Sequence, residues 1–313
     1  RQWQVVKEEY FTATGRCAVK TQTGLVLALK YHLSDNERLT EQMLRKLLRD
    51  NKNKLNTGFV GTPLLCNVLT EHGMTDLAYR LLLNEEYPGW LHEVKLGATT
   101  VWERWNSLDE NGRISSTGMN SLNHYSYGAV LEWIFRHVAG IDVTEQGPGG
   151  KMMRISPKVD HKLGSASAVY DSASGCYRCG WQIENGDQIT VTVTVPFGAK
   201  AQVILPYAPD SVYHDTDNPL FETVENGICC VKAGQYTVTY KAASPLKKSY
   251  SVDSTLEDLL AEPAIRAFLS HMMEVDMIPD LAYGLTLRQA AEAFAGGVSA
   301  EQAQRLNVLL EEF

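Results

Sequence analysis

The hydrophobic period of the chain changes from helical to strand-like and back again, and this limits the possible folds more than any other feature. The segment ERLTEQMLRKLLRD (37–50) places apolar side chains three and four residues apart, as one face of a helix does. The segment QITVTVTV (188–195) alternates apolar and polar residues, as a half-buried strand does. Helical spacing returns after residue 252. The chain is therefore predicted to have a helical part, a sheet part and a second helical part.

Residues 1–141 are predicted to form short helices joined by short links, which is typical of αα-hairpins stacked in a bundle or toroid. An antiparallel β-sandwich follows at 142–248, with the Gly- and Pro-rich EQGPGG as the linker into it. A small helical tail occupies 249–313. The predicted helices are 23–32, 37–50, 62–72, 76–83 and 121–138, with a loop at 84–99, and then 255–261, 263–274, 286–295 and 299–312. The predicted strands are 167–171, 178–184, 188–195, 201–205, 221–231 and 235–241.

Composition excludes several classes of protein. Hydrophobic residues make up 44% of the chain and charged residues 21%, which is ordinary globular usage. The formal charge is −8 and no long basic run is present, so we expect no nucleic-acid partner. No apolar stretch approaches the ~20 residues that cross a bilayer, and no signal-peptide core is visible, so we expect no membrane partner and a cytoplasmic location. The start at Arg1 rather than Met suggests a processed or shortened chain.

The six cysteines are expected to be reduced thiols of an intracellular protein. Cys176, Cys179, Cys229 and Cys230 offer four possible thiolate ligands. Zinc sites usually draw on two C-x2-C pairs, whereas two adjacent cysteines point to opposite faces of a strand. We therefore expect no metal and no cofactor, and a single disulfide between the first and second pair stays open.

We expect the functional site of the chain in the segment YPGWLHEVKLGATTVWERWN (87–106). It holds Trp90, Trp102 and Trp105, with Glu103 between the last two. Flat indole faces bind the C–H face of a pyranose, and a carboxyl group acts as acid or base on a glycosidic bond. The alternative is that Trp102 and Trp105 form one helical face of the core, with Glu103 solvated on the other.

Two motifs, GATTVWERWNS and NHYSYGAVLEWIFRHVAGI, follow in this order along the chain. These motifs carry a resemblance to glycoside hydrolase family 78, the bacterial α-L-rhamnosidases. It covers nearly all of residues 1–245 and takes in the C-terminal half of that family's catalytic domain and the β-sandwich that follows it. The resemblance implies a partial (α/α)6 toroid of αα-hairpins, then the antiparallel β-sandwich and the helical tail. It also implies that Glu103 is the general base of an inverting mechanism and that His124 hydrogen-bonds the sugar. Taken alone, His124 would better suit a satisfied core histidine on an apolar helix. Trp90, Trp105 and Trp102 are candidates for a sugar platform, and any of the three could instead belong to the core.

In the resembling family the general acid lies upstream, and no matching acidic motif precedes Glu103 here. We therefore expect part of an inverting hydrolase that releases terminal α-L-rhamnose, with rhamnose-containing glycosides as partners but little activity alone. The missing N-terminal half of the toroid, or self-association, would cover apolar helix faces left exposed. The alternatives are a noncatalytic carbohydrate-binding or structural unit, and a glycosidase of the same fold with another sugar specificity. The tail is expected to be a packing cap or a docking module.

Overall fold

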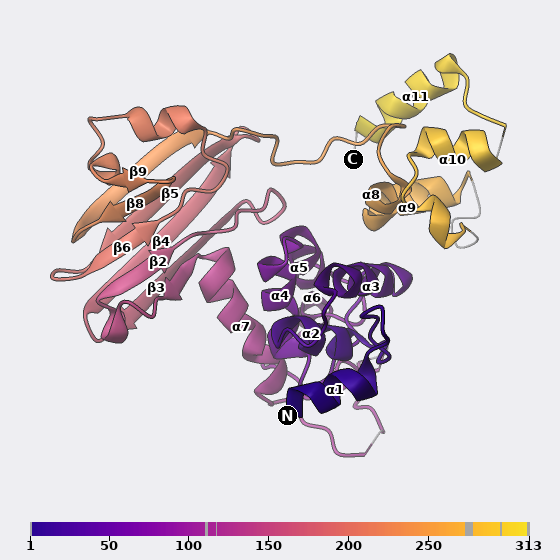
Figure 1. Cartoon of the computed structure of the whole chain (residues 1–313), viewed down its shortest axis with the longest axis horizontal. Helices are drawn as coiled ribbons and strands as arrows, with labels where there is room; N and C mark the ends of the chain where they lie inside the picture. The colour runs from indigo at the N-terminus through magenta and orange to yellow at the C-terminus, as the bar shows by residue number, and fades with distance from the viewer. Residues whose placement is uncertain (1, 110–111, 117, 273–277, 295, 312–313) are drawn as a thin grey trace. The chain divides into compact units, whose positions relative to one another are not determined.

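The computed structural model of the chain describes residues 2–109, 112–116, 118–272, 278–294 and 296–311. These residues form two compact units, which are described separately. The first unit comprises 1–48 and 54–246, and the second comprises 49–53 and 247–313. The order of helices, then strands, then helices along the chain confirms the predicted fold class (Figure 1).

The helices of the first unit follow the apolar spacing of the sequence closely. The predicted helix 37–50 is observed with those bounds, and its face with Thr40, Leu44 and Leu48 is buried. The predicted loop 84–99 is wrong in one respect, because a short helix lies inside it. The helices are α1 (Gln2–Tyr10), α2 (Gln22–Lys30), α3 (Glu37–Asp50), α4 (Thr62–Glu71), α5 (Thr75–Leu82) and α6 (Trp90–Lys95).

The single helix predicted at 121–138 is wrong at its start and in its regularity. Residues 121–124 pair with another loop segment instead, so helical turns begin only at residue 126. A 3₁₀ turn η1 (Ser126–Ala129), the helix α7 (Val130–Trp133) and a π-helical turn η2 (Ile134–Val138) then follow without interruption. Gly140 ends them with a φ of +83°, and a Cβ atom there would lie 2.3 Å from the nitrogen of Pro157. Only glycine suits both requirements.

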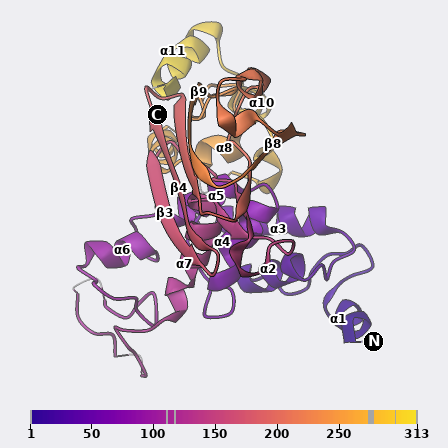
Figure 2. The same cartoon turned by 90° about the vertical axis from the view of Figure 1, so that its left-hand side faces the viewer.

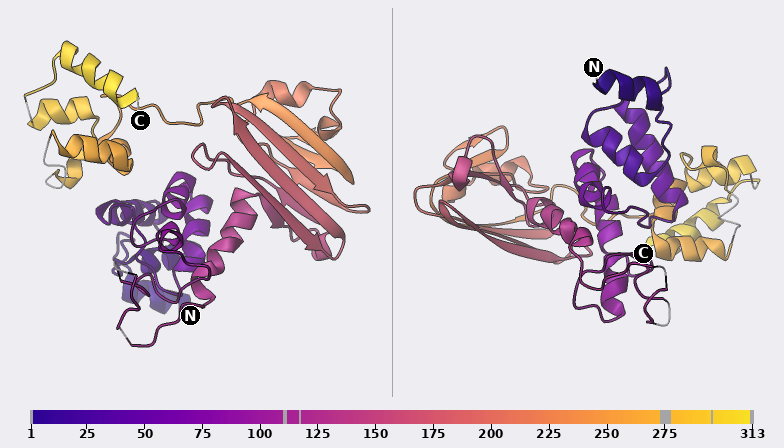
Figure 3. Two further views of the ribbon diagram at one scale, coloured as in Figure 1. Left: turned by 180° about the vertical axis from the view of Figure 1, so that it is seen from behind. Right: turned by 90° about the horizontal axis from the view of Figure 1, so that it is seen from below.

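Two sheets build the sandwich, and they lie face to face as two layers (Figure 3). The five-stranded sheet has the order β1-β2-β6-β8-β7, and the four-stranded sheet has the order β3-β4-β5-β9. In β5 the apolar side chains are buried and the threonines are partly or fully exposed, as the alternation predicts. The strands are β1 (Ile141–Val143), β2 (Met152–Ile155), β3 (Ser165–Ser172), β4 (Gly175–Glu184), β5 (Gln188–Val195), β6 (Lys200–Val203), β7 (Val224–Glu225), β8 (Ile228–Val231) and β9 (Gly234–Lys241).

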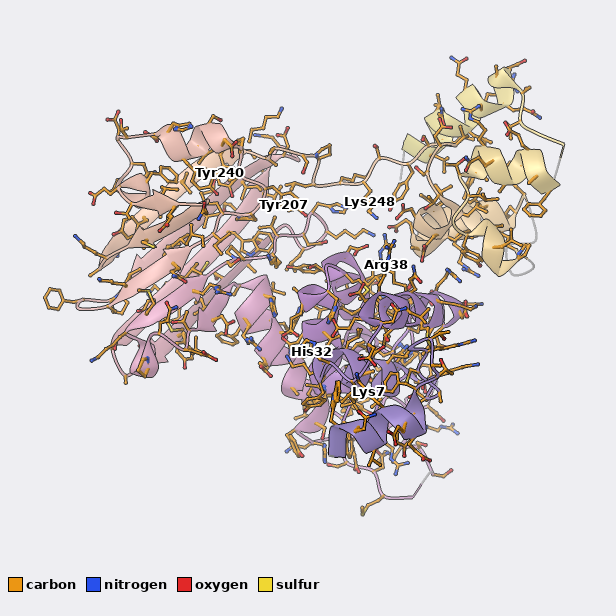
Figure 4. All side chains as sticks on the ribbon, in the orientation of Figure 1. Lys7, His32, Arg38, Tyr207, Tyr240 and Lys248 are labelled. Atoms are coloured by element: carbon orange, nitrogen blue, oxygen red, sulfur yellow. The ribbon has the colours of Figure 1, made fainter. Side chains whose placement is uncertain are left out.

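The segment EQGPGG is a connection inside the sandwich rather than a linker into it. It joins β1 to β2, and the buried hydroxyl of Tyr177 donates to Gly150 O at 2.8 Å. The chain then crosses into the other sheet for three strands and returns as β6, which pairs parallel with β2. This is the one parallel pair among the described strands. The hydroxyl of Tyr240 on β9 donates to Pro206 O at 2.7 Å, which ties β9 to the chain after β6 (Figure 4).

The helical and sandwich parts of the first unit share one hydrophobic core. The indole N–H of Trp181 on β4 donates to Val138 O at 2.7 Å, and the Lys158 N–H donates to His137 O at 2.8 Å. The hydroxyl of Tyr79 on α5 donates to Lys158 O. Helices before residue 141 and strands after it therefore pack as one body.

The second unit has a hydrophobic core of its own. The helix predicted at 255–261 begins at Leu256, and Thr255 caps it by accepting from Asp258 N at 3.1 Å. Thr286 and Ser299 begin their helices as predicted, each accepting from a backbone N–H three residues on. The helices are α8 (Leu256–Ala261), α9 (Pro263–Ser270), α10 (Leu287–Phe294) and α11 (Ala300–Glu311); the predicted helix ends at 274, 295 and 312 lie outside the described residues.

All six cysteines lie within the described residues, and each is a free thiol. The open possibility of a bridge between the pair at 176 and 179 and the pair at 229 and 230 is therefore not realised in this structure. Within the described ranges, no helix combines the length and the apolar character needed to cross a membrane.

Trp181→Phe tests whether the helical and sandwich parts unfold together. The ring stays apolar, but Val138 O loses its indole donor inside the core, so the free energy of unfolding is expected to fall by about 1–3 kcal/mol. Circular dichroism of helix and near-ultraviolet signals of the sandwich should shift together in urea. The control is Phe197→Ala, because Phe197 is 97% exposed. Separate midpoints for the two signals would contradict the shared core.

Candidate active site

Helix α6 and the irregular loop after it lie on the side of the helical region away from α1 (Figures 2 and 3). The helix ends at Lys95, and Gly97 just beyond it has a φ of +85°. The N–H of Gly97 donates to Val94 O at 2.9 Å, and the N–H of Ala98 donates to Glu93 O at 3.0 Å. This is the Schellman arrangement, which needs a left-handed residue, usually glycine, directly after the helix. It sets the direction in which the chain enters the GATTVWERW segment.

Backbone hydrogen bonds join this segment to the start of the NHYSYGAV segment. The N–H of Glu103 donates to Ser121 O at 2.9 Å, and the N–H of His124 donates to Val101 O at 2.7 Å. A loop connects these two segments. The hydroxyl of the buried Ser107, near the start of this loop, donates to Asn120 Oδ1, near its end, at 2.6 Å. Glu103 and His124 therefore lie on two adjacent, paired stretches of backbone.

His124 is half-buried, and its ring stacks on two exposed aromatic side chains. The ring centroids of Phe59 and Tyr125 are each 5.0 Å from that of His124, with interplanar angles of 18° and 23°. Its Nδ1 accepts from the N–H of Ser126 at 3.3 Å. A neutral imidazole that accepts at Nδ1 carries its proton on Nε2, which leaves one N–H donor for a ligand. Phe59, 47% exposed, was not singled out from the sequence.

The three tryptophans of the loop differ in burial. Trp105 stacks on Tyr127 with ring centroids 4.0 Å apart, and its indole N–H donates to Thr57 O at 3.0 Å. Trp90 is half-buried and meets the Trp105 ring edge-on at 5.3 Å. Trp102 is 3% exposed, so its ring presents no open face in this structure. Trp102 and Trp105 lie in irregular backbone and form no helical face, but both are buried, as the core alternative expects.

Glu93 is the unexpected carboxyl group of the site. Its side chain is 4% exposed, and its Oε1 has no hydrogen-bond partner among the described residues. Burial disfavours the ionised form and raises the pKa of Glu93 to about 8, although the Trp102 N–H opposes the shift. The sequence carries no signal for this, because the burial of a glutamate in a one-turn loop helix depends on tertiary packing.

The arrangement combines the groups that sugar chemistry needs. Glu103 is a half-buried carboxyl, His124 offers an N–H donor, and the rings of Phe59 and Tyr125 stack on His124. A positioned carboxylate can take a proton from water, while ring faces bind the apolar side of a sugar. Among the described residues, no three His, Cys, Asp or Glu side chains gather closely enough to hold a metal ion.

Two family models match the chain. Residues 3–138 match the bacterial alpha-L-rhamnosidase 6 hairpin glycosidase domain, and residues 140–218 match the bacterial alpha-L-rhamnosidase C-terminal domain. The chain is 39% identical over 221 residues to an alpha-L-rhamnosidase of Alteromonas sp. (strain LOR), an alignment that covers 69% of this chain and 23% of that protein. It is 35% identical over 228 residues to an alpha-L-rhamnosidase of Streptomyces avermitilis, covering 72% of this chain and 22% of that protein.

Solved structures show the same similarity. The crystal structure of Streptomyces avermitilis alpha-L-rhamnosidase complexed with L-rhamnose matches with a TM-score of 0.68 at 32% identity, covering 76% of this chain and 23% of that one. The native enzyme from Aspergillus terreus matches with a TM-score of 0.66 at 28% identity, covering 78% and 26%. The chain thus spans less than a quarter of the length of the two curated relatives.

Glu93→Gln tests the burial of this carboxyl through pH. Folded Glu93 keeps its proton up to about pH 8, whereas the unfolded chain loses it near 4.5. The contribution of Glu93 to stability is therefore fully present below pH 4.5 and is lost as pH rises through 8. The neutral amide has no such loss, so the Tm of the variant relative to wild type should be higher at about pH 8 than at about pH 5.

The matched control is Glu85→Gln, an exposed glutamate of the same loop that pairs with Lys95. Its Tm difference from wild type should be nearly the same at both pH values. An equal difference at both pH values for Glu93→Gln would show that Glu93 is ionised in the folded chain.

Proposed function

We propose that this chain, which resembles the C-terminal part of the bacterial alpha-L-rhamnosidases over residues 3–218, supplies the base side of an inverting glycosidase site for terminal α-L-rhamnose. The observation that carries the proposal is the backbone pairing that sets Glu103 beside His124. The solved relative whose structure holds L-rhamnose supports the choice of sugar.

In the proposed mechanism Glu103 takes a proton from the water that attacks the anomeric carbon. Inversion requires a second carboxyl, kept protonated, at ~6.5–9.5 Å on the other side of the glycosidic bond. His124 donates its Nε2–H to a hydroxyl of the sugar. Its ring stacks on Phe59 and Tyr125, contacts that favour one ring orientation before the sugar arrives.

The proposed apolar platform for the sugar centres on Trp90, which is half-buried and hydrogen-bonded through its indole N–H to Tyr127 O at 3.0 Å. Trp105 lies behind it, 9% exposed, and supports the Trp90 ring edge-on. Trp102 is proposed as interior support only. Phe59 and Tyr125 extend the aromatic surface on the His124 side.

We place the general acid on sequence that corresponds to the remainder of the relatives, of which this chain matches 22–23%. The sequence that completes the helical toroid, in the same polypeptide or in a partner, is therefore proposed to supply the acid. Exposed apolar side chains on α1 support such a partner, because Trp3 is 47%, Val5 59% and Tyr10 46% exposed. A second copy of the chain is the other possible occupant of that face.

A noncatalytic role is the second candidate. The aromatic surface around His124 can bind sugar without an acid, since stacking and one N–H donor need no second carboxyl. In that case the chain binds L-rhamnose but never gains activity from the remainder of a toroid.

Glu103→Gln separates the two candidates. We expect the wild-type chain alone to hydrolyse p-nitrophenyl α-L-rhamnoside poorly, and to gain activity when the remainder of the helical domain of a matched relative is supplied. Loss of the base should then lower kcat by about 10²–10⁴-fold, because general-base catalysis contributes that much. Binding of L-rhamnose, measured by calorimetry, should change little because the amide keeps the shape of the side chain.

The control is Glu132→Gln, an exposed α7 residue that pairs with Arg136 at 3.0 Å. It should leave both measurements unchanged. His124→Ala should instead weaken L-rhamnose binding by about tenfold, the worth of one good hydrogen bond. Sugar binding without hydrolysis in every reconstitution would favour the noncatalytic role, and clear turnover by the chain alone would overturn the need for a partner.

A further inference from the structure

We propose that two copies of this chain associate through strand β3 (Ser165–Ser172), whose free edges pair to form one continuous antiparallel sheet. Strand β3 is the first strand of the four-stranded sheet, so one of its two sides has no neighbouring strand. Figure 2 shows it at the margin of that sheet, with β4 on its other side. The proposal does not depend on the proposed glycosidase role.

The pairing of β3 with β4 shows which backbone groups of β3 are free. Gly164, opposite Ile183 in this register, accepts from the Ile183 N–H at 2.8 Å. Hydrogen-bonded and non-hydrogen-bonded pairs alternate along an antiparallel ladder, so the even-numbered residues of β3 bond to β4. The odd-numbered residues direct their N–H and C=O groups away from β4, and no hydrogen bond among the described residues engages these groups. They are Ser165, Ser167, Val169 and Asp171.

The other edge strands of the two sheets are short or partly covered, which is how sheets usually avoid pairing with another chain. Strands β1 and β7 have three and two residues. On β9 the side-chain N–H of Asn218 donates to Thr237 O at 3.0 Å, so the turn that begins there covers part of that edge. Strand β3 has eight residues, with no proline and no lysine. Among the described strands it therefore keeps the longest open edge.

A second copy of β3 can satisfy all of these outward groups in one register. A two-fold axis through Ala168 places residue 165 opposite 171 of the second copy, and 167 opposite 169. Each opposed pair then exchanges two N–H···O bonds, as in any antiparallel ladder. If the pairing shifts by two residues, one outward residue lies beyond the end of the partner strand. The strand is thus self-complementary in length and in hydrogen bonding.

The outer side chains suit the same register. Asp171 lies opposite Ser165 of the second copy, and Val169 lies opposite Ser167. Asp171 is the one charged side chain of the strand, and this register keeps it away from its own counterpart. Like charges directly opposite each other would destabilise the pair, and here none meet. A second copy therefore fits without electrostatic cost along the strand.

The inner face also fits a second copy. Tyr170 lies opposite Ala166 of the second copy, so a large ring meets a small side chain at both ends of the paired strands. A groove of about 550 Å³ adjoins Tyr170 on this face, and Leu131 of α7 and Phe135 of η2 also line it. These two side chains are 56% and 39% exposed. The groove leaves the edge of β3 accessible, and association would shield part of this apolar lining from water.

The experiment measures the mass of the chain by sedimentation across the micromolar range, where we expect an equilibrium between monomer and dimer. Ser167→Pro removes one outward N–H and sets a ring where the second copy must lie. The bonds to β4 stay, because proline is tolerated on an edge strand where its nitrogen faces solvent. The Kd of the dimer should rise by about tenfold or more, since each copy loses a hydrogen bond.

The matched control is Ser167→Ala, which keeps the N–H and should dimerise like the wild type. Near-ultraviolet circular dichroism checks that both variants keep the folded sandwich. Val5→Lys tests the other candidate surface, because Val5 on α1 is 59% exposed, and it should leave the Kd unchanged. A wild-type chain that stays monomeric, or a dimer lost in Val5→Lys and kept in Ser167→Pro, would overturn the proposal.

Amide hydrogen exchange of the wild-type chain gives a second measurement that needs no variant. The N–H groups of residues 167 and 169 face solvent in the monomer, so their exchange should slow as the chain concentration rises. Those of residues 166 and 168 bond to β4 and should stay protected at every concentration. A dimer in which residues 167 and 169 exchange as fast as in the monomer would place the contact elsewhere and refute the proposal.

Discussion

Four indole N–H groups hold the first unit in the shape on which its site depends. Each donates to an oxygen at least 37 residues away in the sequence, and an indole N–H buried without an acceptor costs about 1–3 kcal/mol. The bonds therefore act as distance restraints between elements that otherwise meet only through apolar contact. Two of them position the loop of the site, one fixes α7 on α4, and one fixes β4 on the end of the helical region. The donors and acceptors are Trp90 to Tyr127 O, Trp105 to Thr57 O, Trp133 to Thr70 Oγ1 and Trp181 to Val138 O.

The sequence predicts elements well where periodicity extends over several residues, as in α3 and β5, because burial of one face governs both. It fails where long-range pairing decides. Strands β1 and β2 have three and four residues, too few to show a period, and the glycines between them are typical of a linker. The apolar pattern at 121–138 is helical, yet backbone pairing of 121–124 with the loop removes its first turn.

The residues of the site also differ in whether a local sequence pattern marks them. The roles of Glu103 and His124 were implied by the family resemblance that two motifs carry, and the backbone pairing of their two segments is consistent with a common site while the roles stay proposals. Phe59 and Glu93 were not predicted, for different reasons. Phe59 reaches His124 from another segment, so no local pattern marks it. Glu93 resembles any solvated glutamate until packing buries it, and its orphaned Oε1 is visible only in three dimensions.

The shared core of the helical region and the sandwich has a consequence for how such proteins evolve. The two family models meet between residues 138 and 140, which is where Trp181 bonds Val138 O and His137 O accepts from Lys158. The two regions matched by separate family models therefore do not fold as independent domains in this chain. Exchange of one sandwich for another by recombination would have to replace the indole and its acceptor together, so the two regions are expected to be inherited as a pair.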